Sequence, residues 1–262
     1  MVSTYVRLAW TWTRAAAAYP ASFALMTVLG FVTTGLELAV VLIIFANTTT
    51  LAGFSRDEVL FLYGAAGVSF ALSDMFVSNI DRVSQHIKAG TFDTFLIRPV
   101  SAWLQLTADR FNANRIGRVL QAGLVLGYAV AALGLEWRRA WMIPVMVVTG
   151  FVIFAALWTL AGAVQFVLTD APELANAFTY GGQQLTQYPF SIYGRDLVRG
   201  VTYGLPMAFV NWQPGLYVLD RGDPLGTPEF MRFLGPAAAL ALALAAALAW
   251  RQGIRHYRST GS

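Results

Sequence analysis

The chain has 262 residues, of which 57% are hydrophobic and only 12% are charged, and it carries a net charge of +4. Soluble domains contain about 25% charged residues, so this composition predicts a multi-pass membrane protein rather than a soluble or nucleic-acid-binding one. The sequence has no cysteine and two histidines, which excludes disulfides and predicts no zinc site.

Six apolar segments predict membrane spans, because a helix needs about 20 such residues to cross the hydrocarbon core. They are residues 21–46, 59–79, 116–135, 141–168, 197–210 and 233–250. The first run is too long for the apolar part of a cleavable signal peptide, which has about 7–15 residues. The fifth run is short and contains Gly204 and Pro206. We therefore expect an all-α membrane protein with a single transmembrane domain over residues 1–262.

The distribution of basic residues predicts how the spans are oriented. With the N-terminus in the cytoplasm, the cytoplasmic segments hold most of the 18 Lys and Arg residues, namely Arg7, Arg14, Arg82, Lys88, Arg98, Arg110, Arg115, Arg118, Arg195, Arg199, Arg251, Arg255 and Arg258. The outer segments hold Arg56, Arg138, Arg139, Arg221 and Arg232. This bias places both termini in the cytoplasm.

Two acidic residues, Glu37 and Asp74, fall within the first two spans. A charge at the centre of a membrane helix costs about 2.5–3.5 kcal/mol, so both residues are functional candidates. Glu37 could line a substrate path, pair with an arginine across a dimer interface, or be a protonated carboxyl group. Asp74 is nearer the cytoplasmic end of its span and could equally be an interfacial residue.

The third span and the segment directly before it contain features that can each be interpreted in two ways. Arg110, Arg115 and Arg118 could form a basic collar for anionic substrate or lipid headgroups, or they could be ordinary cytoplasmic charges. Gly123 and Gly127 are spaced so that another helix could approach closely, although such pairs are common.

The longest cytoplasmic loop, residues 80–115, contains the polar stretch "IKAGTFDTFLIRPVS" at residues 87–101. Gly90 is the residue type that ends a helix with a positive φ, and Thr91 is a candidate cap for a second helix. Pro99 ends the unit, because it disfavours a helical conformation at the residue before it. The pattern predicts two short amphipathic helices with a corner at Gly90. These helices could also be a mere interfacial connection between two spans.

Three separated blocks of the sequence share their patterns with one family. The first is Gly90, Asp93, Leu96, Arg98, Pro99, Val100 and Ser101, with Phe92 where many relatives carry leucine. The second is Tyr188, Pro189, Tyr193, Pro206, Ala208, Phe209 and Pro214, and the third is Trp250, Gly253, Tyr257 and Ser259. In this order, and over nearly the whole chain, they resemble bacterial ABC type-2 transporter permeases of unassigned substrate.

The resemblance implies the type-2 ABC exporter fold, with six transmembrane helices, a cytoplasmic coupling helix and re-entrant outer-face helices. In this family the loop between the second and third spans docks on a separate ATPase, which would make residues 80–101 a coupling region. Its docking residues would be Ile87, Lys88, Gly90, Phe92, Asp93, Phe95, Leu96, Arg98 and Pro99. The apolar ones would fill a groove on the ATPase, and the charged ones would set the register.

The resemblance also implies the partners and the location. The chain would be a non-catalytic exporter subunit in the bacterial cytoplasmic membrane, in contact with lipid, with two ATPase copies and a second permease, identical or related. ATP and Mg²⁺ would be bound by the ATPase, with no cofactor in this chain. The sequence agrees, because a Walker A motif needs a lysine after its glycine-rich loop and the only lysine, Lys88, has no such context.

The proline-rich residues 202–228 would correspond to the re-entrant helices that close the exit of the pathway. Pro206, Trp212 and Pro214 would form an outer gate, anchored at the membrane interface by Trp212 and Tyr217.

Other interpretations stay open at this point. Residues 170–195 are expected to return to the cytoplasmic face, as a second ATPase contact or a lateral gate. A proton-coupled secondary transporter would use Glu37 and Asp74 as proton relays and would need no ATPase. A membrane scaffold would use the cytoplasmic loop for docking alone.

Overall fold

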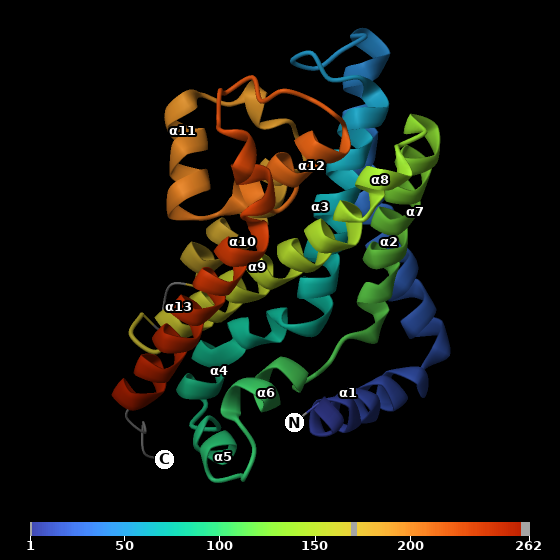
Figure 1. Ribbon diagram of the computed structural model, residues 1–262. Coiled ribbons are helices and arrows are strands. Elements are labelled where there is room, and N and C mark those ends of the chain that lie inside the picture. The colour runs from blue at the N-terminus through green and yellow to red at the C-terminus, as the bar shows by residue number, and fades with distance from the viewer. Residues whose placement is uncertain (1, 169–171, 258–262) are drawn as a thin grey trace.

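The computed structural model describes residues 2–168 and 172–257, and over these residues the chain is helical, with one isolated β-bridge between Leu51 and Phe54 (Figure 1). Within the described part, five helices are long and apolar enough to cross a membrane. They are α2 (Pro20–Asn47), α3 (Arg56–Phe76), α7 (Ile116–Leu133), α9 (Met142–Val164) and α13 (Gly235–His256). These helices match the first four predicted spans and the last one.

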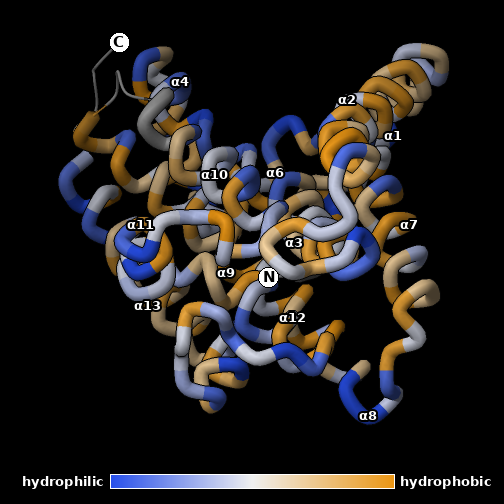
Figure 2. The backbone as a smooth tube through the Cα atoms, turned by 90° about the horizontal axis from the view of Figure 1, so that it is seen from above, coloured by the Kyte–Doolittle hydropathy of each residue, from blue (hydrophilic) through white to orange (hydrophobic). Residues whose placement is uncertain are grey.

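The long helices are arranged around α3. Seen from above, α3 lies between α2 and α7 on one side and α9 and α13 on the other (Figure 2). It packs against both α7 and α9, while α2 packs along α7 and α13 along α9. In the apolar segment of α3, 78% of the residues are buried, against 6% in α2. An apolar helix that is enclosed by other helices is a core helix, so α3 is the core of the bundle and α2 is one of its outer faces.

Close packing of α7 depends on Gly117. A Cβ atom at this position would lie 2.1 Å from the backbone oxygen of Thr27 in α2, which leaves no room for a side chain. Gly123 and Gly127 have no close neighbour within the described part of the chain, since no atom lies within 4 Å of a Cβ atom built at either residue. The closely packed face of α7 is therefore the one that contains Gly117.

Short helices gather at one end of the bundle, called the α1 end below (Figure 1). They are α1 (Val2–Ala17), α4 (Val83–Lys88), α5 (Asp93–Leu96) and α6 (Ala102–Ala108), beside the last turns of α13. α1 lies across the bundle, with Ala9 buried and Trp10 61% exposed. The Tyr5 hydroxyl donates to the backbone oxygen of Phe76 at 2.8 Å and so fastens α1 to the end of α3. The sequence predicted no helix here, because the first apolar run begins only after this segment.

The opposite end carries the cap, defined as residues 190–234. It contains α11 (Arg195–Arg199), a π-helical turn (Gly200–Gly204), α12 (Trp212–Val218) and 3-10 turns at Phe190–Ile192, Met207–Phe209 and Glu229–Phe233, and α8 (Trp137–Ala140) lies at the same end. α10 (Pro172–Thr186) packs against α9 and α3. It ends at the cap, where the Asn211 amide donates to the backbone oxygen of Thr186.

The prediction of a membrane span over residues 197–210 is wrong. These residues are divided between α11, the π-helical turn and a 3-10 turn, because Gly204 and Pro206 interrupt regular helix. α11 lies at the cap end (Figure 1). Arg195 and Arg199 therefore lie on the same side as Arg221, and not with the arginines that were expected in the cytoplasm.

Candidate functional site: a polar interior and a coupling loop

A small polar cavity lies inside the bundle, between α2, α3, α7 and α10. Its volume is about 100 Å³, enough for several water molecules. The polar residues that line it are Thr33, Thr34, Glu37, Tyr63, Arg118, Gln121, Tyr180, Gln183, Gln184 and Gln187. The Glu37 carboxylate accepts a hydrogen bond from Nε2 of Gln187 at 3.0 Å. Glu37 therefore faces this cavity.

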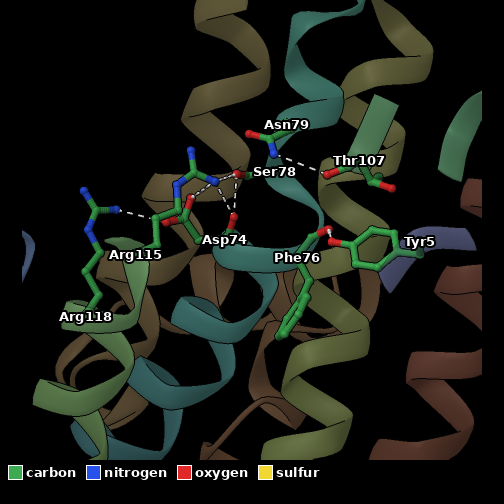
Figure 3. A network of polar contacts seen from close by, with 8 residues as sticks. All are labelled: Tyr5, Asp74, Phe76, Ser78, Asn79, Thr107, Arg115 and Arg118. Atoms are coloured by element: carbon green, nitrogen blue, oxygen red, sulfur yellow. Dashed lines mark hydrogen bonds and ion pairs between the residues drawn. The ribbon is translucent and has the colours of Figure 1, made fainter. Parts of the chain in front are cut away.

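Asp74, near the end of α3, is fully buried and lies between two arginines of the α7 region (Figure 3). Nη1 of Arg115 is 3.4 Å from Oδ1 of Asp74, and Nη1 of Arg118 is 3.1 Å from Oδ2. Arg115 also donates to the backbone oxygen of Asp74 and to the Ser78 hydroxyl. A buried carboxylate needs such partners, because its removal from water is costly. The Asp74 side chain is therefore enclosed by protein and paired with two arginines.

Arg118 joins these two polar features. It pairs with Asp74 and also lines the cavity that contains Glu37. The predicted basic collar is only partly available for ligands, since Arg115 and Arg118 are engaged with Asp74, while Arg110 is exposed. Polar contacts thus connect α2, α3, α7 and α10 in the interior of the bundle.

The polar loop has the corner that the sequence predicts. α4 ends at Lys88, α5 begins at Asp93, and Gly90 between them has a φ of +66°, a conformation that glycine adopts without strain. Thr91 does not cap α5, because its hydroxyl contacts Nδ1 of His86 at 2.9 Å instead.

An aromatic cluster built from three parts of the chain holds the inner face of this loop. The Phe92 ring packs edge-on against Phe166, just after α9, and against Tyr257, just after α13, with centroid distances of 5.1 and 4.8 Å. Phe166 also contacts Trp250 at 5.2 Å. A Cβ atom at Gly253 would lie 2.5 Å from the Phe166 ring, which explains a glycine in the C-terminal block. The first and third sequence blocks therefore meet in space.

This packing corrects the predicted docking face. Ile87, Phe92 and Phe95 are 5%, 0% and 8% exposed, so they cannot fill a groove on another protein in this conformation. Leu96 and Ile97 are 41% and 83% exposed. Arg98, Pro99 and Lys88 are also exposed, whereas Gly90 and Asp93 are half-buried. The surface that the loop offers is therefore the tip, defined as residues 96–99. Ser259, the last residue of the third block, lies outside the described residues.

A cationic recess of about 340 Å³ opens against α4 and α5. It is lined by Arg82 and Arg110, and neither forms an ion pair with a residue that the structure describes. One guanidinium nitrogen of Arg82 is buried without a hydrogen-bond partner. Burial raises the pKa of the neighbouring Asp81 carboxyl group. His86 also lines the recess, with Nε2 3.4 Å from a carboxylate oxygen of Asp109.

The predicted gate residues belong to the interior of the cap. Trp212 is 1% exposed, and its ring stacks on Phe190 at 6.0 Å and contacts Phe54 at 5.3 Å. The prediction that Trp212 anchors the cap at the membrane interface is wrong, because protein encloses the side chain. Pro214 is buried within α12, and Pro206 is half-buried before a 3-10 turn.

Two arginines fasten the cap to the bundle. Arg221 makes a bidentate pair with Glu58, at 2.7 and 2.8 Å, and Glu58 also accepts a hydrogen bond from the backbone N–H of Ser55 that caps α3. The hydrogen bonds to Glu58 raise the pKa of Arg221. Arg139 donates to the backbone oxygen of Tyr217 at 2.9 Å and pairs with Asp220 at 2.7 Å. The sequence did not reveal these contacts, because their partners lie far apart in the chain.

The long apolar helices define the class of the protein, an integral membrane protein. Residues 31–261 match the family described as ABC-2 family transporter protein, and the chain therefore belongs to this family. It is the permease of an ABC transporter. No curated protein and no solved structure matched the chain.

Proposed function

We propose that the chain is the transmembrane subunit of an ATP-driven exporter, which moves its substrate across the bacterial cytoplasmic membrane with the help of a separate ATPase. In this proposal the α1 end and both termini are cytoplasmic and the cap faces outward. The charge distribution supports the orientation, because cytoplasmic flanks are rich in basic residues. The described basic residues at the α1 end are Arg7, Arg14, Arg82, Lys88, Arg98, Arg110, Arg115, Arg118, Arg251 and Arg255.

In this proposal α10 is the fifth membrane crossing, in place of residues 197–210, for which a span was predicted. It lies on the path from α9 to the cap, and the chain then returns through α13 (Figure 1). With 15 residues it extends about 22 Å, which is less than the roughly 30 Å of a hydrocarbon core. Gln183 on this helix and Gln187 directly after it line the polar cavity with Glu37. α10 is therefore one wall of the transport path, and its displacement opens the cavity.

The observation that carries the proposal is the contact between residues 80–101, the proposed coupling loop, and two membrane helices. Phe92 packs against Phe166 and Tyr257, which follow α9 and α13. A movement of the loop is transmitted to both helices, because closely packed side chains shift as a unit. The tip docks on the ATPase through Leu96 and Ile97. Acidic groups of the ATPase enter the recess at Arg82 and Arg110, and ATP and Mg²⁺ bind to the ATPase.

A second permease, identical or related, completes the transporter. An ABC transporter has two ATPase copies, and each copy needs its own coupling loop. α2 provides a surface for the second permease or for lipid, since Leu25, Leu36 and Ile43 along it are between 56% and 66% exposed.

The proposal is tested by tagging the chain in its host, extracting it in mild detergent and counting the co-purified proteins by mass spectrometry. We expect one ATPase per permease. A preparation without an ATPase, under conditions in which another ABC complex of the same membrane stays intact, contradicts the proposal. That result would favour proton-coupled transport, with Glu37 as the first residue to change.

A further inference from the structure

Arg195 and Arg199 lie at the cap end, which the proposed orientation places outside, where basic residues are less common. They are four residues apart on α11, so their side chains share one helical face. Together with Thr202, Tyr203 and residues 225–228 they line an open recess of about 300 Å³. Neither arginine forms an ion pair within the part of the chain that the structure describes.

No acidic residue is among the described residues that line this recess. Asp196 is on α11 but does not line the recess. Asp223 lies behind Thr227, where Oδ2 accepts hydrogen bonds from the Thr227 hydroxyl and from the Gln213 amide at 3.1 Å. Oδ1 of Asp223 accepts the backbone N–H of Leu225 at 2.9 Å. Both oxygens of Asp223 are therefore already hydrogen-bonded to groups other than Arg195 and Arg199.

Exposed apolar side chains lie beside the recess. Leu197, Tyr203 and Phe230 are 49%, 69% and 62% exposed. Exposed aromatic residues next to charged ones are typical of the headgroup layer of a membrane. Guanidinium groups at that depth meet phosphate oxygens, which they bind through paired hydrogen bonds.

We propose that Arg195 and Arg199 form a phosphate-binding recess at the outer mouth of the protein. The two guanidinium groups hold the phosphate oxygens, and the hydroxyl group of Thr202 provides a further donor. The phosphate belongs to a lipid headgroup of the outer leaflet or to a soluble molecule near the exit, and both present the same group to the recess. This site rests on the geometry of the cap and is independent of the ATPase.

Isothermal titration calorimetry on the purified chain in neutral detergent tests the site with three probes. They are inorganic phosphate, dihexanoyl phosphatidic acid and dihexanoyl glycerol, which has the same acyl chains without phosphate. Arg195→Gln and Arg199→Gln are compared singly and together with the wild type. Arg138→Gln is the matched control, because Arg138 lies at the cap end over the Trp137 ring and outside the recess. Thermal unfolding verifies that each variant is folded.

Each single substitution is expected to weaken binding of a phosphate-bearing probe about tenfold, and the double substitution about a hundredfold, with the control unchanged. Binding of inorganic phosphate supports a soluble ligand, and binding of phosphatidic acid alone supports a lipid headgroup. The proposal is overturned if the wild type binds neither phosphate probe or binds dihexanoyl glycerol equally well. It is also overturned if the recess variants bind like the wild type or the control loses as much affinity as they do.

Discussion

The loop of residues 80–101, proposed above as the coupling loop, is held to its helices by packed rings, whereas the cap is also fastened to the bundle by arginine ion pairs. Phe92 connects the coupling loop to residues after α9 and α13, while Arg139 and Arg221 connect the cap to neighbouring helices. Buried rings lose dispersion contacts and apolar burial when they separate, but partly exposed ion pairs can exchange their partners with water. The comparison predicts that the coupling loop moves with its helices as one body and that the cap opens by releasing polar contacts.

The largest expected effect is that of Phe92→Ala, which removes a fully buried ring from the aromatic cluster. We expect the free energy of unfolding to fall by about 3–5 kcal/mol, because a cavity replaces the ring. Ile97→Ala is the matched control in the same loop, since Ile97 is 83% exposed. Denaturant titration in detergent measures both. Equal stabilities of the two variants would show that the cluster does not hold the loop.

Asp74→Asn tests whether polar contacts in the interior are stronger than those at the cap. The change leaves Arg115 and Arg118 without their carboxylate, and we expect a loss of about 3 kcal/mol in the free energy of unfolding. The same denaturant titration applies. A variant as stable as the wild type would mean that water stabilises the charges of both arginines in place of the Asp74 carboxylate.

Gly117→Ala tests the contact between α2 and α7. The added methyl group meets the backbone oxygen of Thr27, and we expect a loss of about 1–3 kcal/mol from overpacking. Gly123→Ala, on the open face of the same helix, should change stability by less than about 0.5 kcal/mol. Thermal unfolding distinguishes the two, and a larger effect at Gly123 would place its face, and not that of Gly117, against a neighbour.

The smallest expected effect is that of Arg221→Gln, which breaks the pair with Glu58 at the cap. The Arg221 side chain is 42% exposed, so solvent screening limits the loss to about 1 kcal/mol. Hydrogen exchange of residues 212–218 should nevertheless increase, because the cap loses a contact to α3. Unchanged exchange would show that the aromatic contacts of Trp212 hold the cap without this ion pair.

The sequence was sufficient to predict the long helices, since each is an apolar run with few interruptions. It failed at residues 197–210, which are apolar enough for a span but contain Gly204 and Pro206. α10, which we propose as a crossing, was missed for the opposite reason. Its glutamines, Gln183 and Gln184, lower the hydropathy, and both line the polar cavity. Hydropathy therefore recognises lipid-facing helices better than crossings that line a cavity.

The candidate site was only partly predictable. Glu37 and Asp74 could be recognised because each interrupts an apolar run, but their partners depend on how the helices are rotated about their axes. The sequence block around Gly90 was correctly recognised as a structured corner. The motif did not reveal that Phe92 packs inward and that Ile97 points outward. A sequence motif does not distinguish residues that pack inside the protein from residues that lie on its surface.

The most direct test of the central claim is the amount of ATPase that co-purifies with Ile97→Asp. Trp137→Asp is the matched control, because Trp137 is 80% exposed at the opposite end of the molecule. We expect one ATPase per permease for the wild type and the control, and a loss of at least tenfold for Ile97→Asp at equal expression. An Ile97→Asp complex that retains its ATPase in full would contradict docking through the tip.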